Sequence, residues 1–152
     1  MEQDIRVRKI KDGTVIDHIT AGQALNVLRI LNLPSGSGAT VTVAMNVPSR
    51  KAGVKDIVKV EGRELRSEEV DRIALLAPEA TINIVRNYRV VEKKKVSIPE
   101  MVEGVLGCAN PNCITHVEPV KPRFRVESRK PIRLRCIYCE RIMCEGEIAG
   151  QF

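Results

Sequence analysis

Aromatic residues are scarce in this sequence, and long apolar runs are missing. Only 3% of the 152 residues are aromatic, and tryptophan is absent. Phe124 and Tyr138 are the only rings near the basic segment at 121–135, which leaves little to stack on nucleic-acid bases. No run is long enough to span a bilayer, and the N-terminus lacks the apolar core of a secretion signal. We therefore expect no nucleic-acid or membrane partner, and a cytoplasmic protein whose thiols stay reduced.

Cysteine is also absent from the first 98 residues, and all five cysteines lie in the last third. Four of them form two short pairs, Cys108-x4-Cys113 and Cys136-x2-Cys139, separated by 22 residues. Thiolates in this arrangement can occupy all four corners of a tetrahedron around Zn²⁺, leaving no open position for water or substrate. The pattern predicts one structural zinc ion per chain and no catalysis at it.

Other uses of the cysteines fit less well. A disulfide framework needs an oxidising compartment. A redox-active Cys-x-x-Cys usually lies where a strand leads into a helix, and no helical pattern follows Cys139. Cys144 can in principle replace a neighbouring ligand, but a small buried apolar residue near the site is the simpler interpretation.

Residues 116–118 (HVE) and the second cysteine pair together mimic the H-x-E and C-x-x-C halves of zinc deaminases. That signature has proline before its first cysteine, where this chain has Arg135. Deamination would also leave Cys108 and Cys113 without a role. We therefore expect His116 at the surface or beside a ligand, and not on the metal.

The length of the chain favours two domains, 1–98 and 99–152. The second has only 54 residues, too few to rely on an apolar core alone, and a structural zinc site supplies folding free energy on the order of 10 kcal/mol. The first must fold by burial, for which the 43% apolar content suffices. The triple-lysine run at 93–95 and the segment 97–99 (SIP) mark the expected hinge.

The N-terminal domain alternates between strand and helix patterns. Strands are predicted at 5–10 and 15–19, joined by an Asp12-Gly13 turn, and a capping box at 20–23 starts a helix that stops before Pro34. In that helix Ala24, Leu25, Leu28 and Leu31 recur at helical spacing. A loop at 35–38 leads to strands at 41–46 and 55–60, which flank a loop at 48–53.

A second helix is predicted to begin at Ser67 as its N-cap and to bury a stripe of Val70, Ile73, Ala74 and Ala77. Strands at 81–85 and 89–96 follow. When the first strand and the last one are set apart, the order β-α-β-β-α-β is that of a ferredoxin-like antiparallel sheet with two helices. The predicted fold class is α+β, with a small all-β zinc-binding domain after it.

Two strands of the C-terminal domain place basic side chains on one face. Apolar residues at 124, 126, 132 and 134 alternate with arginines, and residues 121–135 contain seven Lys or Arg against one Glu. With a net charge of +6, a zinc ribbon that binds nucleic acid is the alternative function. Such a ribbon can equally dock on another protein.

Several motifs in collinear order, covering most of the chain, resemble the regulatory chain of aspartate carbamoyltransferase. They are GTVIDH (13–18), NVPS (46–49), KDIVK (55–59), APEATIN (77–83), NYRVV (87–91), CANPNC (108–113), HVEP (116–119) and CIYCE (136–140). Segments 35–39 and 121–135 depart from better-known members in length and charge.

The resemblance implies a non-catalytic subunit of pyrimidine biosynthesis. Its N-terminal domain would bind CTP, UTP and ATP as allosteric effectors, and its zinc domain would contact the catalytic chain. Regulatory chains of this family pair through their allosteric domains, and three such dimers bridge two catalytic trimers, giving six catalytic and six regulatory chains.

The resemblance also implies site residues. Those for nucleotide binding are Ile10, Val15, Asp17, His18, Lys55, Lys59, Asn83, Val85, Tyr88, Val90 and Lys93. Lysines can neutralise a triphosphate, backbone groups beside Ile10, Tyr88 and Val90 can read base edges, and Asp17 suits a ribose hydroxyl. Taken without this resemblance, the spacing of Lys55 and Lys59 indicates only a strand at a solvated edge of the sheet. The zinc ligands are the four paired cysteines, and the candidate contacts with the catalytic chain are Asn110, Asn112 and Glu140, for which loop capping is the alternative.

Overall fold

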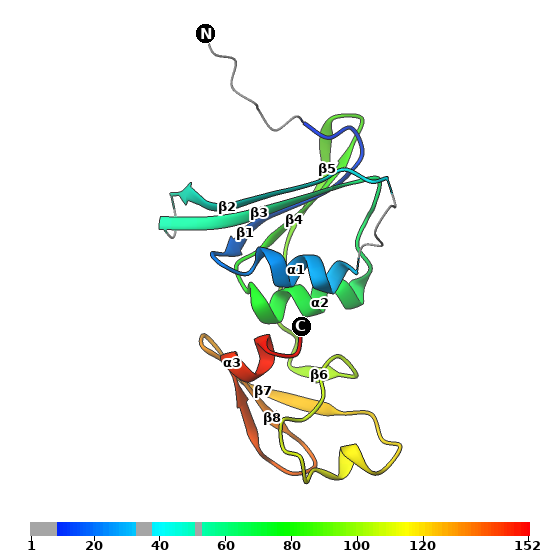
Figure 1. Ribbon diagram of the computed structural model, residues 1–152, viewed down its shortest axis with the longest axis vertical. Coiled ribbons are helices and arrows are strands. Elements are labelled where there is room, and N and C mark those ends of the chain that lie inside the picture. The colour runs from blue at the N-terminus through cyan, green and yellow to red at the C-terminus, as the bar shows by residue number, and fades with distance from the viewer. Residues whose placement is uncertain (1–8, 33–37, 51–52) are drawn as a thin grey trace.

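An antiparallel five-stranded sheet dominates the N-terminal part of the computed structural model, which describes residues 9–32, 38–50 and 53–152. The strands are β1 (Gly13–Thr20), β2 (Val41–Ser49), β3 (Gly53–Glu61), β4 (Thr81–Arg86) and β5 (Arg89–Lys95), in the order β2-β3-β1-β4-β5. Helices α1 (Ala24–Leu31) and α2 (Ser67–Leu76) cover one face of it (Figure 1). The predicted ferredoxin-like fold is therefore confirmed, with β5 added at one edge.

The helix α1 buries Ala24, Val27, Ile30 and Leu31 against the sheet. Leu25, which was expected in this stripe, is 55% exposed, so that expectation was wrong. The predicted capping box is also absent, because the N-cap makes no side-chain hydrogen bond. The helix ends at Asn32, whose left-handed backbone (φ 46°) lets its N–H reach the last carbonyls.

The helix α2 begins one residue earlier than predicted. Its N-cap is Arg66 and not Ser67, and the carboxylate of Glu69 accepts the Arg66 backbone N–H at 3.0 Å. Glu69 is buried and also pairs with Arg63. Val70 is only partly buried, so the core stripe runs through Ile73 and its neighbours to Leu76.

The loop predicted at 48–53 is wrong, because strand pairing continues into it. β2 extends through Pro48 to Ser49, and β3 begins at Gly53, with Pro48 opposite Val54. Proline cannot donate a ladder hydrogen bond, but β2 is an edge strand, where that donor is not needed. Of the predicted strand at 5–10, Lys9 and Ile10 are not in a strand, and 5–8 lie outside the described residues, as do 35–37 of the predicted loop.

The C-terminal part is a four-stranded antiparallel sheet in the order β6-β7-β8-β9. Its elements are β6 (Met101–Glu103), a 3₁₀ turn (Ile114–His116), β7 (Arg123–Arg129), β8 (Ile132–Cys136), β9 (Ile142–Cys144) and the short helix α3 (Glu145–Ala149). Phe124, Leu134 and Met143 form its buried centre. The sheet confirms the all-β prediction, and α3 is an addition that was not predicted.

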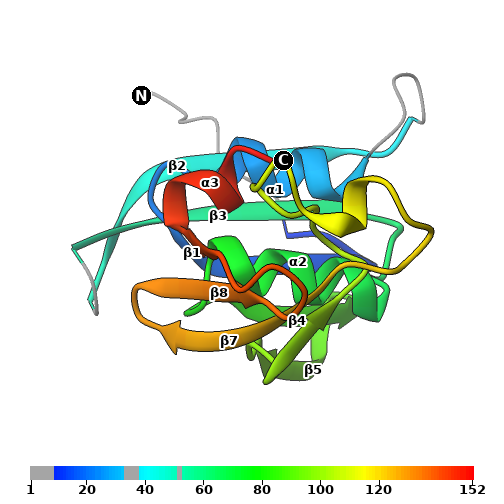
Figure 2. The same ribbon diagram turned by 90° about the horizontal axis from the view of Figure 1, so that it is seen from below.

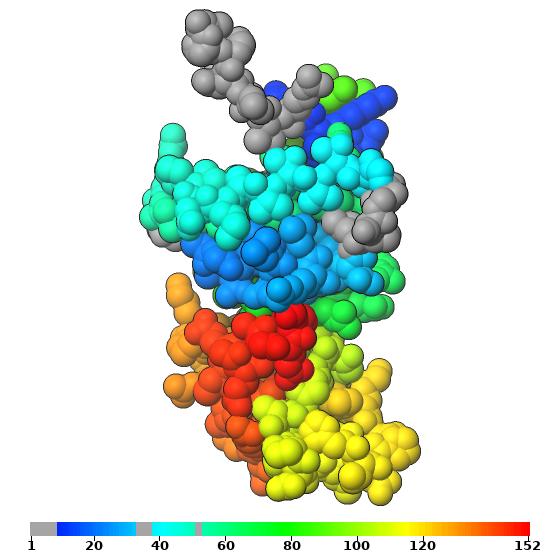
Figure 3. Space-filling view, in the orientation of Figure 1, coloured from blue at the N-terminus to red at the C-terminus, as the bar shows by residue number. Residues whose placement is uncertain are grey.

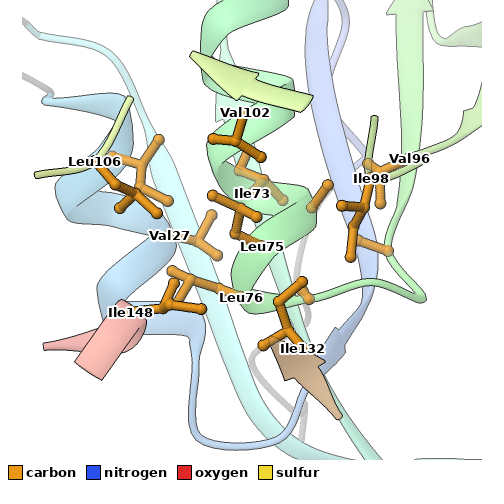
Figure 4. Close-up of a cluster of buried hydrophobic side chains, with 14 of the residues drawn as sticks. Val27, Ile73, Leu75, Leu76, Val96, Ile98, Val102, Leu106, Ile132 and Ile148 are labelled. Carbon is orange, nitrogen blue, oxygen red and sulfur yellow. The ribbon is translucent and has the colours of Figure 1, made fainter. Parts of the chain in front are cut away.

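The two parts share one apolar core. The C-terminal unit (99–152) sits against the helices of the N-terminal unit (9–98), on the side away from the five-stranded sheet (Figure 1, Figure 2). In the space-filling view the two units stack end to end (Figure 3). Val27 and Leu76 meet Ile132 and Ile148 across the junction (Figure 4).

The expected hinge does not form a free linker. Lys93, Lys94 and Lys95 belong to β5, and after them Val96 and Ile98 are 4% and 6% exposed. These two apolar side chains insert into the shared core (Figure 4). The connection between the units is therefore held by packing.

Candidate functional site

The four paired cysteines converge on one point of the C-terminal unit. Cys108 and Cys113 lie in the segment between β6 and β7, Cys136 ends β8, and Cys139 lies in the turn before β9. Their sulfur atoms lie within 4.8 Å of one another. The Sγ atoms of Cys108 and Cys139 are 3.6 Å apart, and those of Cys113 and Cys136 are 3.7 Å apart.

These separations fit a metal tetrahedron. With Zn–S bonds of about 2.3 Å, the sulfurs of a tetrathiolate site lie about 3.8 Å apart, whereas a disulfide needs about 2.05 Å. All five cysteines are free thiols. The four clustered residues could therefore hold one metal ion, with no position left for substrate.

Hydrogen bonds around the cluster favour the thiolate form of its members. The backbone N–H of Asn110 donates to the Cys108 sulfur at 3.4 Å, and the Thr115 hydroxyl donates to Cys113 at 3.2 Å. Glu140 closes the second turn by donating its N–H to the carbonyl of Cys136 at 2.9 Å. Its left-handed backbone (φ 66°) is what allows this tight return.

Burial and hydrogen bonding act on the acidity of the clustered thiols in opposite directions. Burial raises the pKa of Cys108 to about 12, and the neighbouring thiols of Cys139 and Cys136 add to this. Burial also acts to raise the pKa of Cys139, but hydrogen bonds, first from the Arg141 backbone and then from the Asn110 side chain, lower it to about 6. A bound cation is needed for all four to be thiolates together.

Two cysteine-region expectations have clear outcomes. Cys144 is exposed and outside the cluster, so its interpretation as a small buried residue was wrong. The ring Nε2 of His116 lies 2.9 Å from the carbonyl oxygen of Cys108 and does not join the thiols. The resemblance to a deaminase site therefore has no geometric support.

The predicted nucleotide residues gather on the sheet face opposite the helices. The strand register aligns Lys59 of β3 with Val15 of β1, Val15 with Asn83 of β4, and Asn83 with Lys93 of β5. Their sequence neighbours Ile16, Val58 and Ile82 point into the core, so this row faces the other way. The amide of Asn83 donates to the carbonyl of Val15 at 3.2 Å, which orients it within the row.

Asp17, His18 and Lys55 lie next to this row, where a bulge interrupts β1. The Lys55 Nζ lies 2.9 Å from the Asp17 carboxylate. Burial acts to raise the pKa of Asp17. The hydrogen bonds from Lys55 and from the His18 backbone, and the Coulombic interactions with these two side chains, outweigh burial and lower the pKa. His18 has a left-handed backbone (φ 57°), and such strain is common at binding sites.

The predicted base-reading residues surround the β4–β5 turn. Asn87 and Tyr88 both have positive φ, 51° and 66°, and the Tyr88 N–H donates to the carbonyl of Lys11 at 2.9 Å. Tyr88 and Val90 are exposed, whereas Ile10 and Val85 are each 6% exposed. Contacts to Ile10 and Val85 would therefore involve mainly their backbone groups. The register thus brings Lys59, Val15, Asn83 and Lys93 into one row. The nucleotide-binding role of all eleven residues stays a prediction.

The candidate docking residues flank the cysteine cluster. Asn110 and Asn112 lie between the first two cysteines, where the Asn112 N–H donates to the Asn110 side chain at 3.0 Å, and Glu140 follows Cys139. Four exposed apolar side chains nearby could not be predicted from the sequence, because they lie in a 3₁₀ turn and in loops that carry no strand or helix periodicity. They are Ile114, Val117, Val120 and Tyr138, which are 37% to 79% exposed.

The basic face of β7 and β8 is less positive than its sequence suggests. Arg123 pairs with Glu103 at 3.1 Å, and Arg135 pairs with Glu127. Arg129 donates to the carbonyl of Ile98. Carboxylates thus neutralise two of the seven positive charges of this segment. Among the described residues no helix is long and apolar enough to cross a membrane.

Comparisons with known proteins extend over both units. The model of the family described as "Aspartate carbamoyltransferase regulatory chain, allosteric domain" matches residues 5–97, and that described as "Aspartate carbamoyltransferase regulatory chain, metal binding domain" matches 100–149. The aspartate carbamoyltransferase regulatory chain of Hyperthermus butylicus is 60% identical over 147 residues, covering 95% of this chain and 92% of that one. Those of Thermococcus gammatolerans and Pyrococcus furiosus are 58% and 59% identical, covering 97% and 95% of this chain and 97% and 96% of theirs.

Proposed function

Since this chain belongs to the family of aspartate carbamoyltransferase regulatory chains, which are non-catalytic subunits, we propose that it senses nucleoside triphosphates and controls the catalytic chain of pyrimidine biosynthesis. CTP, UTP and ATP are the proposed effectors. The observation that carries this proposal is the aligned row of Lys59, Val15, Asn83 and Lys93 on the open face of the sheet.

The chemistry of that face suits a nucleotide. Lysines at both ends of the row supply charge for phosphates, and the Asn83 amide between them can pair with a polar group of the base or sugar. Asp17 can accept a hydrogen bond from a ribose hydroxyl, and backbone groups of the exposed residues Tyr88 and Val90 can bind a base edge. The row carries a positive charge at each end and a neutral amide in its centre. It can therefore bind the base or sugar as well as the phosphates, which inorganic phosphate alone would not require.

Zinc is the proposed metal of the cysteine cluster. Four thiolates in a closed tetrahedron are typical of structural Zn²⁺, and the sulfur separations of 3.6 and 3.7 Å agree with it. A site of four thiolates requires that its cysteines stay reduced. The cytoplasm keeps thiols reduced, so the four-cysteine site supports a cytoplasmic location.

The cysteine-containing unit is the proposed docking surface for the catalytic chain. Asn110, Asn112 and Glu140 supply polar groups, and Val117 and Tyr138 supply exposed apolar area beside them. Apolar residues rimmed by polar ones are typical of protein interfaces. Because the metal organises these loops, docking should depend on it.

The N-terminal unit is the proposed site of pairing between two regulatory chains, within an assembly of six catalytic and six regulatory chains. β2 is an edge strand that carries no charged residue and exposes Val41 and Met45. Edge strands of monomers are usually protected by charges. β5, the other edge, carries three lysines instead.

Transmission between the units is proposed to use the shared core. An effector shifts an assembly by its different affinity for two quaternary states, typically by 1 to 3 kcal/mol. Val27 and Leu76 on one side and Ile132 and Ile148 on the other form the packed contact that such a shift must rearrange.

Calorimetric titration of CTP, UTP and ATP into the full chain tests the nucleotide site. Lys59→Gln and Lys93→Gln are each expected to weaken CTP binding about tenfold, with Lys121→Gln, on the other unit, as the control. Silence of the unmodified chain with all three nucleotides would refute the proposal. Retained assembly with the catalytic chain after zinc removal would refute the docking role alone.

A further inference from the structure

A cavity of about 530 Å³ lies between the two units. Its size falls within the range of about 300 to 1,000 Å³ that is usual for small-molecule sites. One wall comes from the end of β1, the β2–β3 hairpin and the last turn of α2. The other comes from the β7–β8 turn and the first residue of α3. A ligand inside it would touch both units at once.

The floor of the cavity is apolar and fixed. Ile19, Leu76 and Ile132 line it and belong to the shared core. Their exposures of 0%, 7% and 4% show that neighbouring side chains hold them in place. The cavity therefore rests on rigid packing, and its chemistry is decided by the side chains higher on its walls.

Basic residues from both units line these walls. The N-terminal unit contributes His18 and Lys55, and the β7–β8 turn contributes Arg129 and Lys130. Two carboxylates are also present, but that of Glu79 lies 2.8 Å from the Lys95 Nζ. The other, Glu145, begins α3. Lys55 is likewise paired, with Asp17 at 2.9 Å, so Arg129 and Lys130 of the turn face Glu145 as the remaining acid of the lining.

We propose that the phosphate tail of a bound nucleoside triphosphate enters this cavity and contacts the β7–β8 turn at Lys130, so that one effector bridges both units. This inference rests on the proposed function, in which His18 and Lys55 belong to the nucleotide site. Those two residues also line the cavity, so a phosphate group that they bind from the cavity side faces the turn. The turn, orange in the figures, rises toward the N-terminal unit (Figure 1, Figure 3).

The turn is suited to this role. Arg129 donates to the carbonyl of Ile98 at 3.3 and 3.2 Å, which ties the turn to the connection between the units. Lys130 is exposed, and no carboxylate among the described residues forms an ion pair with it. Its ammonium group is available to a phosphate without breaking a contact of the protein. A ligand that contacts both walls of the cavity binds more tightly to the arrangement of the two units that allows both contacts. It stabilises that arrangement by the difference between its affinities for the two arrangements.

The test compares Lys130→Gln and Lys130→Glu with Lys121→Gln, a matched lysine of the same unit that does not line the cavity. CTP, CMP and cytidine are titrated calorimetrically into each full chain. We expect Lys130→Gln to weaken CTP binding about three- to tenfold and Lys130→Glu to weaken it more. Cytidine binding should change less than twofold in both, because it carries no phosphate. Lys121→Gln should match the unmodified chain with every ligand.

Hydrogen exchange gives a second readout. CTP should slow amide exchange at 129–132 of the unmodified chain, and this protection should be lost in Lys130→Glu. Equal CTP affinity in all variants, or no protection of the turn, overturns the bridging contact while leaving the nucleotide site intact. If the unmodified chain binds none of the three ligands, the proposed function fails and the bridge fails with it.

Discussion

The buried carboxylate of Asp56, on β3, caps the helix α1 by accepting the backbone N–H of Ala24 at 3.1 Å. The same carboxylate accepts the N–H groups of Gly22 at 2.9 Å and of Asn46 at 3.0 Å. One side chain thus joins the start of α1 to the irregular part of β2. It replaces the local capping box that the sequence around Thr20 suggested.

Asp56→Ala should lower the free energy of unfolding by about 3 kcal/mol, because it removes a charged acceptor from three N–H groups, of which that of Ala24 is buried. Urea denaturation followed by circular dichroism measures the change. Glu64→Gln, an exposed carboxylate on the same unit, is the control and should shift the free energy by less than about 0.5 kcal/mol. A loss below about 1 kcal/mol for Asp56→Ala would show that water replaces the cap.

Cys136→Ser should abolish stoichiometric zinc binding, since three thiolates no longer close the tetrahedron. The C-terminal sheet should then lose protection from proteolysis, because metal binding supplies part of its folding free energy. Elemental analysis of purified protein gives the zinc content. Cys144→Ser is the matched control, because this thiol lies outside the cluster, and it should retain one zinc ion. Equal zinc in both variants would refute the assignment of the ligands.

Leu76→Ala should cost about 2 to 4 kcal/mol of unfolding free energy, since it opens a cavity in the core shared by the two units. Leu25→Ala makes the same chemical change on α1 at a side chain that is 55% exposed. It should cost less than about 0.5 kcal/mol. Chemical denaturation of both variants measures the difference, and similar losses would contradict the shared core.

Asp17→Asn should reduce stability only above acidic pH. The pKa of Asp17 is lowered in the folded chain, so its ionised form adds stability that is full above about pH 5 and disappears as the pH falls through the folded-state pKa. The unfolding free energies of variant and unmodified chain should therefore converge once the pH falls below the folded-state pKa of Asp17. A difference that does not depend on pH would contradict this.

Asp71→Asn provides a contrast of opposite sign. Burial raises the pKa of Asp71, against the attraction of Lys94. The ionised carboxylate is therefore slightly unfavourable in the folded chain at neutral pH. Replacing it with the neutral amide should leave the free energy of unfolding at neutral pH unchanged or slightly higher. Thermal denaturation at pH 7 checks the sign.

Spacing and periodicity within short segments were sufficient to predict much of this protein. Alternation of apolar residues placed most strands, and helical spacing located α1 and α2, because these patterns depend on neighbours within a turn or two. The cysteine pairs predicted a four-thiol cluster for a similar reason, since the ligand types and their spacing are local. The boundaries around Pro48 and Ser67 were wrong, because edge pairing and a buried Glu69 decide them.

The tertiary structure alone decided what joins distant segments. Asp56 reaches Ala24 across 32 positions, and Lys59 and Lys93 enter one row only through the register of four strands. The same holds for the core around Leu76 and for the cavity between the units. Such contacts follow from how the whole chain buries its apolar faces, and the free energy of that burial is not encoded in any single segment.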